Sequence, residues 1–588
     1  MNFEILPNEI LIECFNYLNP IDLFYSFDYL NTRLSTLIRR IKLHVNFQSI
    51  NKYEFDRFCL LIDLDFNIKQ QTQSICLSNK DFCQIYFFLS KYSLNEFIHL
   101  RSLTLINVKE HNISQLQAIL PFLSQLLTFR LVESDKRCDR ILSALQISQL
   151  RILSIPRSSW FDQQSVLDIS SIIKLSISDC NINTLHRILT LASTLTSLSI
   201  DYVGRNSNRI LSEKAISSSL QKLIIKDFDE QCSELIHLLK RTPYLQSLTL
   251  VIDSDHHVFD ADQWETFINS SLSFLRTFQF VFEYDHLNKL KQFQTYFWQY
   301  QHHWYTEYIL FGDMSVVYTL PLILDRYSLI SNMNIFANQS IDFKNKYDHV
   351  RDLTIDPQCE FRDYFSYITN LTLEKLVSTT VNQYNIESMT KLFNFTHIKH
   401  LQIDLSCQIY TPCILLEIFK RAPNISSLSI DLQQLLPLLD VDEFCYYLKL
   451  MIKQLDLISK ITILFENVYL MNKFCETFVN IEQITCCILE RDSLLFFLNR
   501  FPKLLRLNIP STMPRFIYQI LDLEQEKLKL SIEIIFDLHL TSTHGLSMWI
   551  IHYSSYFQTI EKIKSYKNDS ILNRIQMKMN RMFFKCVV

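Results

Sequence analysis

Two histidine groups are the side chains of this chain whose type and spacing come closest to a reactive site. His397 and His400 stand three positions apart, a spacing that on a helix lets two imidazoles bind one metal ion. The pair leads into an apolar alternation that starts at Ile398, which predicts a strand on which the two rings need not converge. No further ligand is evident, so we expect no metal there. The other group, His302 and His303, lies in an aromatic stretch and is expected to pack in a core.

Glycine is scarce in this sequence, and its scarcity excludes several classes of enzyme. The chain holds 3 glycines, Gly204, Gly312 and Gly545. Phosphate-binding loops, dinucleotide fingerprints and nucleophile elbows all need glycines at fixed spacing, because the backbone must bend sharply or approach the ligand closely. No such motif, paired carboxylate or catalytic triad is present. We therefore expect neither enzymatic activity nor a cofactor.

Cysteine usage and charge indicate the compartment and the partners to expect. The 15 cysteines form no C-x-x-C pair, and the adjacent Cys486 and Cys487 fall in an apolar run, which is typical of thiols acting as small hydrophobic residues in a reducing compartment. The net charge of −4 favours neither nucleic acid nor an acidic membrane surface. No apolar run reaches the roughly 18 residues of a membrane helix, and no basic signal segment opens the chain. We expect an intracellular protein of the cytoplasm or nucleus.

A repeated pattern defines the elements that must carry any site. Three distant stretches each show an apolar helical run, a basic residue, a proline and an L-x-x-L-x-L strand, and the prolines are Pro243, Pro423 and Pro502. The strand pattern alone starts at Leu100, Leu126, Leu150, Ile172, Leu195, Leu220, Leu245, Leu275, Val350, Ile368, Ile398, Ile425, Ile458, Ile481 and Leu504. Weaker copies are Thr72-Ile75-Leu77, Tyr305-Tyr308-Leu310 and Ile330-Met333-Ile335. Because alternate apolar residues face one side of a strand, we expect Leu248, Leu428 and Leu507 to be buried.

This pattern resembles the leucine-rich-repeat family over roughly residues 71–540, irregularly around 281–349. The resemblance implies an α/β solenoid in which strands line a concave face and helices line the convex one. The family's usual Asn or Cys three residues after the last strand position is present at Cys180 but replaced at most other repeats, for example by Phe228 and Asp253. The alternative is an ordinary α/β domain with parallel strands. Residues 46–70 are expected to form a helical linker, and the basic residues 541–588 a helical cap or tail.

The N-terminal stretch Leu6–Phe24 predicts a pair of short helices with surplus apolar surface. Pro7 and Pro20 each suit a first helical position, since that position needs no N–H. The first helix should run from Pro7 to Leu18, and its intramolecular stripe is expected at Ile10, Leu11, Cys14, Phe15 and Leu18. Leu6, Pro7 and Ile12 fall outside that stripe. Some forty residues bury little core by themselves, so the spare apolar side chains indicate a partner.

Residues 1–45 resemble an F-box. The residues that carry the resemblance are Leu6, Pro7, Glu9, Ile10, Leu11, Phe15, Leu18, Asp22 and Leu23. The family implies docking on the Skp adaptor of a cullin ubiquitin ligase, and the expected adaptor-binding residues are Leu6, Pro7, Glu9, Ile10, Ile12, Phe15, Leu18 and Leu23. The alternative is a plain helical cap on the repeats, which terminal repeats require.

Together the two resemblances imply a substrate-recognition subunit of an SCF-type ligase that acts in ubiquitin-dependent protein degradation. Its partners would be the Skp adaptor, the cullin scaffold and a target protein, with neither nucleic acid nor membrane. The target is expected on the polar face of the strands, at Lys174, Asp201, Lys222, Lys226, His400, Gln402, Asp404 and Arg506. The alternative function is a free-standing leucine-rich-repeat scaffold with no ubiquitin role.

Overall fold

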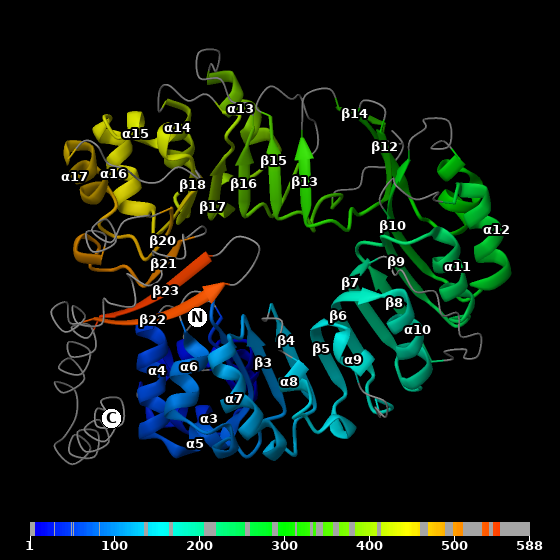
Figure 1. The fold of residues 1–588 in the computed structure, drawn as a ribbon, viewed down its shortest axis with the longest axis horizontal. Helices are drawn as coiled ribbons and strands as arrows, with labels where there is room; N and C mark the ends of the chain where they lie inside the picture. Colours follow the sequence, from blue (N-terminus) through cyan, green and yellow to red (C-terminus); the bar gives the residue numbers. More distant parts are fainter. Residues whose placement is uncertain are drawn as a thin grey trace. The chain divides into compact units, whose positions relative to one another are not determined.

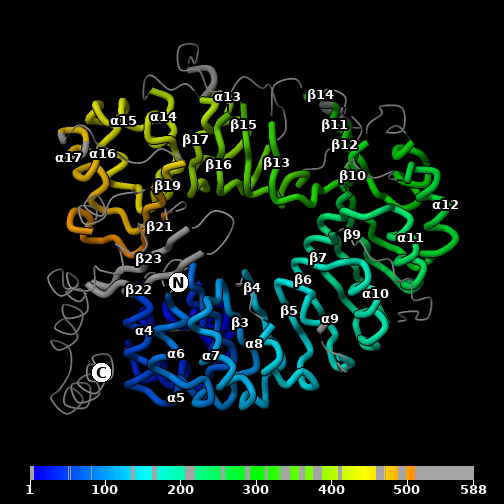
Figure 2. The backbone as a smooth tube through the Cα atoms, in the orientation of Figure 1, coloured from blue at the N-terminus to red at the C-terminus, as the bar shows by residue number. Residues whose placement is uncertain are grey.

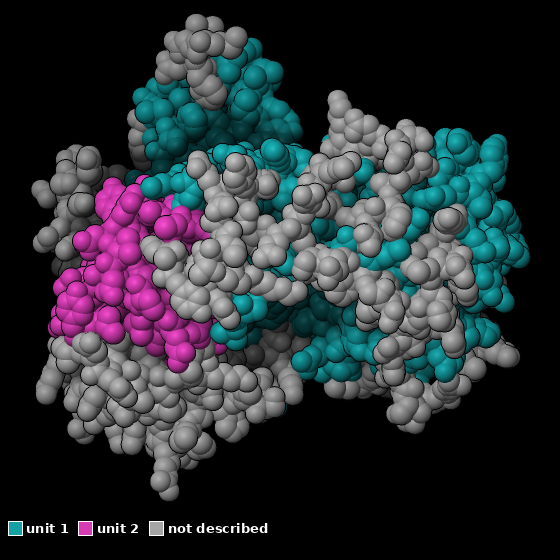
Figure 3. Space-filling view, turned by 90° about the horizontal axis from the view of Figure 1, so that it is seen from above, with its two compact units in different colours: residues 1–409, 417–424 teal, residues 410–416, 425–588 magenta. Residues whose placement is uncertain are grey.

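In the computed structural model the chain forms two compact units (Figure 3). Unit 1 comprises residues 1–409 and 417–424, and unit 2 comprises residues 410–416 and 425–588. The structure describes residues 6–28, 30–48, 50, 52–80, 83–133, 139–163, 169–204, 219–252, 259–284, 292–311, 314–329, 333–336, 345–356, 364–374, 383–407, 413–458, 468–487, 498–509, 532–539 and 545–552. Within these ranges no helix has both the length and the apolar character needed to cross a membrane.

Short helices open unit 1, and they are α1 (Asn8–Asn16), α2 (Pro20–Phe27) and α3 (Thr32–Ile38). Pro20 takes the first position of α2, and the Asn19 side chain accepts a hydrogen bond from the Ile21 amide at 3.3 Å. Asn31 caps α3 in the same way, accepting from the Leu34 amide at 2.8 Å. The predicted start of the second helix is confirmed, whereas α1 is shorter than predicted at both ends.

Ten strands of unit 1 pair in parallel, each with the next along the chain (Figure 2). They are β1 (Leu43–Asn46), β2 (Thr72–Ser78), β3 (Ser102–Ile106), β4 (Thr128–Val132), β5 (Ile152–Arg157), β6 (Lys174–Asn181), β7 (Ser197–Gly204), β8 (Lys222–Ile225), β9 (Ser247–Ile252) and β10 (Thr277–Tyr284). The expected α/β class with a large parallel sheet is confirmed. The sheet also begins earlier than predicted, because β1 lies across the boundary between residues 1–45 and the expected helical linker 46–70.

The strand register explains why the repeated leucines recur. Leu198 of β7 lies opposite Leu175 of β6 and Leu223 of β8, and all three side chains are buried. The polar residues between the leucines face the other side, as the two-residue period of a strand requires. Each leucine therefore packs against its counterparts in the neighbouring strands, and no strand buries its apolar side alone.

Helices between these strands cover the apolar face of the sheet (Figure 1). They are α4 (Lys52–Leu64), α5 (Phe66–Gln71), α6 (Gln84–Lys91), α7 (Glu110–Ile119), α8 (Asp139–Leu142), α9 (Ser159–Gln163), α10 (Ile182–Leu191), α11 (Cys232–Lys240) and α12 (Ala261–Ser271). The 3-10 turns are η2 (Leu94–Glu96), η3 (Leu120–Phe122), η4 (Ile147–Gln149) and η7 (Phe395–His397). Side chains define several starts: Asn181 caps α10 through the Thr184 amide, and Asp260 and Gln263 form a capping box at α12.

Short side chains just before the strands connect neighbouring turns of unit 1. The Ser171 hydroxyl donates to the Ile147 carbonyl at 3.0 Å, and the Ser219 hydroxyl donates to the Leu195 carbonyl at 2.9 Å. Asn424 plays the same part with its amide. These bonds satisfy turn carbonyls at the amino ends of the strands, whereas the Asn or Cys missing from most repeats would act at the carboxyl ends.

The parallel order is interrupted by antiparallel strands and a short π-helix. They are η6 (Phe297–Gln301), β11 (Thr306–Phe311), β12 (Met314–Thr319) and β14 (Met333–Phe336). β12 pairs antiparallel with β10 and β11, and β14 pairs antiparallel with β11. The two weak repeat copies predicted at Tyr305-Tyr308-Leu310 and Ile330-Met333-Ile335 are therefore wrong, because their apolar alternation serves β-hairpin pairing.

Parallel pairing resumes within unit 1 in a second run of strands. They are β13 (Arg326–Leu329), β15 (Asp352–Ile355), β16 (Asn370–Leu373) and β17 (His400–Ile403), with α13 (Gln383–Leu392) before β17. Leu324, Tyr327 and Leu329 fit the strand pattern with tyrosine at its second position, and β13 was not predicted.

Unit 2 continues the same local plan. Its parallel strands are β18 (Ser427–Ile430), β19 (Gln454–Leu457), β20 (Gln483–Thr485) and β21 (Arg506–Ile509), followed by the antiparallel pair β22 (Ile532–His539) and β23 (Gly545–His552). Its helices are α15 (Leu432–Leu438), α16 (Asp442–Met451) and α17 (Val468–Thr477), and the division between the units passes through α14 (Cys413–Arg421).

One prediction for unit 2 lies outside the described residues and another is corrected. The strand pattern assigned to Ile458 continues into residues 459–467, which the structure does not describe, and the strand before it, β19, uses Ile452, Leu455 and Leu457, which are buried. Residues 541–588 are not all helical, since β23 is a strand, and the basic residues from 553 onward lie outside the described part of the chain.

The proline-marked turns are confirmed. The prolines that stand in turns before β9, β18 and β21 are Pro243, Pro423 and Pro502. The inner strand residues that follow them, Leu248, Leu428 and Leu507, are fully buried. In each case proline ends the preceding helix, and its turn leads into a strand whose second apolar position is in the core.

Candidate protein-interaction surfaces

Helix α1 buries only one side. Leu11 and Phe15 lie in the core, whereas Ile10, Cys14 and Leu18 are exposed, Ile10 to 49%. The predicted intramolecular stripe is therefore too broad. The described part of the chain leaves Ile10 and Cys14 uncovered.

The exposed apolar side chains of α1 follow helical spacing. Pro7, Ile10, Cys14 and Tyr17 stand at intervals of three or four residues, so they form one stripe along the helix, named here the α1 stripe. Tyr17, which is 81% exposed, was not predicted. A stripe of this kind is the usual way for a helix to present itself to a partner groove.

The predicted adaptor residues divide into surface and core. Pro7, Glu9, Ile10 and Leu18 are exposed, and Leu6 and Ile12 are half-buried. Phe15 and Leu23 are buried among helices α1 to α3, which are called the helical unit below. These two are corrected to supporting residues, because a partner cannot reach them while α1 and α2 stay packed.

Arg33 holds the start of α1. Its Nε donates to Asn8 Oδ1 at 2.9 Å, and its Nη2 donates to the Leu6 carbonyl at 2.6 Å. These charge-assisted bonds from α3 fix the direction of Leu6 and Pro7 just before α1. Arg33 was not predicted, because the sequence reading followed apolar positions alone in this segment.

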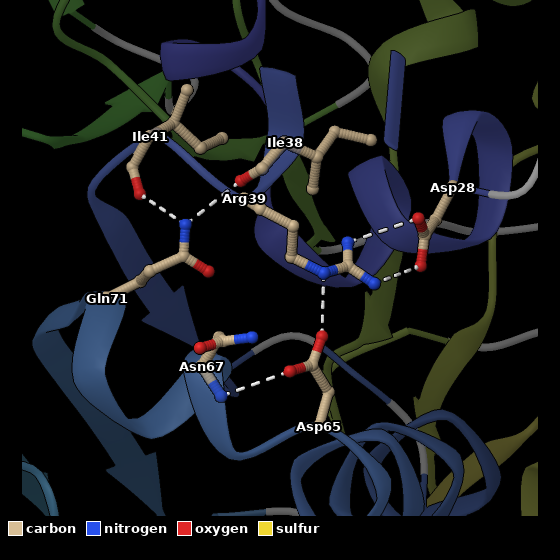
Figure 4. A network of polar contacts seen from close by, with 7 residues as sticks. All are labelled: Asp28, Ile38, Arg39, Ile41, Asp65, Asn67 and Gln71. Atoms are coloured by element: carbon tan, nitrogen blue, oxygen red, sulfur yellow. Dashed lines mark hydrogen bonds and ion pairs between the residues drawn. The ribbon is translucent and has the colours of Figure 1, made fainter. Parts of the chain in front are cut away.

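Arg39, just after α3, connects the N-terminal helices to the start of α5 through ion pairs (Figure 4). Its guanidinium makes a bidentate pair with Asp28, at 3.1 and 2.9 Å, and its Nε lies 2.6 Å from Asp65 Oδ2. The Asp28 side chain is 1% exposed. Asp65 also caps α5 by accepting from the Asn67 amide at 3.0 Å. One cation therefore joins the loop after α2 to the start of α5.

Further contacts reinforce this junction. The Gln71 amide at the end of α5 donates to the carbonyls of Ile38 and Ile41, each at 3.1 Å (Figure 4). The Asn19 amide donates to the Asn46 carbonyl at the end of β1, at 3.2 Å. The helical unit is thus bonded to both the first strand and the second helix of the sheet, so the α1 stripe has a fixed direction relative to β1.

The predicted target residues of the first parallel run lie on one face of the sheet. Lys174 and Lys222 are both opposite Ser197 of β7, so they are two strands apart at the same level. Both are exposed and make no ion pair within the described residues. Lys226 is paired with Asp201 at 2.9 Å, which reduces its availability to a partner. Lys174 and Lys222 therefore contribute unpaired positive charge to this face.

The other predicted target residues lie elsewhere. His400 and Gln402 are exposed positions of β17, and partial desolvation of the His400 ring, followed by the charge of Lys399, lowers the pKa of His400. Asp404 Oδ1 accepts from the Ser406 amide at 2.8 Å and shapes the turn after β17. Arg506 belongs to unit 2, where its Nε donates to Asn508 at 3.0 Å.

Side chains that could support other chemistry are packed or separated. His397 stacks on Tyr367 at 6.3 Å and has Nδ1 3.1 Å from the Ser366 carbonyl, apart from His400. Among the described residues, no three His, Cys, Asp or Glu side chains are arranged to hold a metal ion. Burial raises the pKa of Cys59 to about 12 and of Cys475 to about 11, so these thiols stay protonated and weakly nucleophilic.

Comparison with known proteins gives no assignment: no protein-family model matches the chain, and no curated protein matches its sequence.

Proposed function

We propose that the chain is the substrate-recognition subunit of an SCF-type cullin ubiquitin ligase, with an N-terminal F-box that binds the Skp adaptor and a leucine-rich-repeat solenoid that binds a target protein. The observation that carries the proposal is the α1 stripe: an apolar helix side left exposed yet held in one direction by Arg33 and Arg39. Catalysis would then be the proximity of the target to the charged conjugating enzyme, which the assembly supplies.

The strand arrangement supports the solenoid part of the proposal. Strands β1 to β10 pair in chain order and in one direction, with their leucines in register. A doubly wound α/β domain instead reverses its strand order at a switch point and covers both faces of the sheet with helices. Here no reversal occurs before β10, and the face with Lys174 and Lys222 carries polar side chains.

Replacing Ile10 with arginine is expected to abolish co-purification of the full chain with a Skp-type adaptor. The side chain is half exposed and contributes little to the core, so a charge there costs little folding free energy but cannot be buried in an apolar interface. The measurement is recovery of the co-expressed adaptor on the tagged chain, together with circular dichroism of the variant.

Asn16→Arg is the matched control, because Asn16 is exposed on the same helix about a third of a turn away from the stripe. Its adaptor recovery should equal that of the parent chain. If the parent chain recovers no adaptor, or if Ile10→Arg recovers as much as Asn16→Arg, the helical unit is not an adaptor-docking domain.

The contacts of the helical unit also favour a second function, a free-standing leucine-rich-repeat scaffold. The bond from Asn19 to the Asn46 carbonyl and the position of β1 at the edge of the sheet are what a terminal cap needs. A cap, however, buries its apolar side chains against the repeats, whereas the α1 stripe is exposed. Adaptor co-purification separates the two functions.

Charge reversal of both Lys174 and Lys222 is expected to reduce recovery of target proteins about fivefold or more. These cations make no ion pair within the described residues, so their reversal repels whatever acidic surface docks on this face. The measurement is quantitative mass spectrometry of proteins bound to the adaptor-loaded chain. Lys240→Glu, on the exposed side of α11, is the control. Equal losses in both variants, or none, would exclude this face as the target site.

A further inference from the structure

A polar cavity of about 450 Å³ opens in unit 1 where strands β5, β6 and β7 end. Its lining includes Arg157, Asp179, Tyr202, Gly204 and Asp229. A cavity of this volume falls in the range that ordinary ligands occupy. None of these residues belongs to the α1 stripe or to the predicted target residues, so the cavity is a separate feature of the same sheet.

The strand register brings the polar side chains of the cavity together. Arg157 of β5 lies opposite Asp179 of β6, and Asp179 lies opposite Tyr202 of β7. Residues at matched positions of neighbouring strands share a face, so these three side chains stand side by side at the carboxyl edge of the sheet. The Ser158 amide donates to the Asp179 carbonyl at 2.9 Å, which extends the ordered backbone beyond β5.

Tyr202 is held in place by two neighbours. Its hydroxyl donates to Asp229 Oδ2 at 3.0 Å. Gly204 leaves room for the ring, because a Cβ at that position would lie 2.9 Å from Tyr202 Cε1. One of the few glycines of the chain is thus used to seat a tyrosine that remains 37% exposed. The ring therefore offers part of its surface to a ligand.

The described lining of the cavity carries more carboxylates than cations. It holds Asp179 and Asp229 against the one guanidinium of Arg157. The hydrogen bond to Asp229, followed by the negative charges of Asp229, Asp227 and Asp179, raises the pKa of Tyr202, which is consistent with an electronegative site. The Asp179 carboxylate makes no ion pair within the described residues. The arrangement favours a ligand with a positive charge.

We propose that this cavity binds an arginine side chain of a partner polypeptide. A guanidinium can form a bidentate pair with a carboxylate such as Asp179 while stacking on the exposed ring of Tyr202, and a compact ammonium group cannot do both. The inference rests on the proposed function only in taking the ligand to be part of a protein, and neither the adaptor nor the helical unit enters it.

The test measures binding of two tripeptides to the full chain by calorimetry and ligand-observed NMR. The probes are acetyl-Gly-Arg-Gly-amide and the same peptide with citrulline, which keeps the shape of arginine and removes its charge. The arginine peptide should bind at least tenfold more tightly than the citrulline peptide. Asp179→Asn, a near-isosteric change at an exposed position, should weaken arginine-peptide binding at least fivefold, and Asp262→Asn, at an exposed position of α12 outside the cavity, should not.

Arg157→Gln distinguishes a cation site from an anion site. Removing this guanidinium should strengthen binding of the arginine peptide, because it removes the one positive charge of the described lining. Equal binding of the two peptides, no binding of either, or loss of binding in Arg157→Gln would each overturn the proposal. None of these results depends on the adaptor, so adaptor co-purification still decides the proposed function by itself.

Discussion

Replacing Arg39 with methionine is expected to destabilise the junction between the N-terminal helices and β1 by about 3–5 kcal/mol. The change leaves the Asp28 carboxylate, 1% exposed, without the cation that lies 2.9 Å from it, and it also removes the link to Asp65. Methionine keeps the apolar part of the side chain beside Phe24. The measurement is hydrogen exchange of the amides of α1 to α3 and β1, followed by mass spectrometry.

Asp28→Asn in the Arg39→Met background is the matched second variant. It removes the buried Asp28 charge that Arg39→Met leaves without a cation, so a large part of the lost stability should return. Asp65→Asn alone should cost much less, because Asp65 is only the secondary partner of Arg39 and an asparagine oxygen can still cap α5. If Arg39→Met leaves exchange in the helices unchanged, the junction is not held by this network.

The Arg39→Met variant also has an expected effect on ubiquitin transfer under the proposed function. Arg39 does not belong to the α1 stripe, so the adaptor should still bind the variant. The direction of the stripe relative to β1 would no longer be fixed, however, and transfer of ubiquitin to a bound target depends on that spacing. Target ubiquitination in a reconstituted ligase should therefore fall more than adaptor affinity.

The repeated strands could be predicted from sequence because their apolar residues are local and periodic. The L-x-x-L-x-L pattern requires only that apolar and polar residues alternate along a strand and that a helix follow. Both features can be recognised from residues that are close together in sequence. β13 fits the same pattern at Leu324, Tyr327 and Leu329 but was not predicted, and β19 was not predicted at Ile452, Leu455 and Leu457. The β11–β12 pairing could not be predicted from period alone, since hairpin strands alternate in the same way.

The surfaces were less predictable, because exposure depends on how elements turn toward one another. The helical spacing of Ile10 and Cys14 is compatible with either burial or exposure, and packing of α1 on Leu11 and Phe15 decides between them. Arg33 and Arg39 were not predicted, because the prediction for this segment used only its apolar residues and the partners of both arginines lie far away in sequence. The cavity at Tyr202 depends on the register of three strands and on one glycine, which no local pattern reports.

Replacing Lys346 with methionine is expected to destabilise unit 1 by about 3–5 kcal/mol, because it leaves a buried carboxylate without its cation. Glu307 of β11 is 2% exposed at its side chain, and Lys346 Nζ lies 2.6 Å from its Oε1. The hydroxyls of Tyr318 and Tyr347 approach the other oxygen at 3.1 and 3.4 Å. Two phenol hydroxyls cannot neutralise the Glu307 carboxylate, so in the variant water must reach this carboxylate or the protein must unfold locally. The measurement is the urea midpoint for exchange of the β11 and β12 amides.

The location of this ion pair gives the prediction its specificity. Glu307 stands in the antiparallel insertion, whereas Lys346 and Tyr347 precede β15, and the Tyr347 ring packs against Tyr327 of β13 at 5.3 Å. The pair therefore joins the insertion to the resumed parallel strands, and its loss should raise exchange in β11, β12 and β13 before β2 to β6. Glu307→Gln combined with Lys346→Met should restore most of the stability, since a neutral amide still accepts from the tyrosines. Lys222→Met, at an exposed cation, should change nothing. Uniform destabilisation across unit 1, or no rescue by glutamine, would contradict a buried charge pair as the cause.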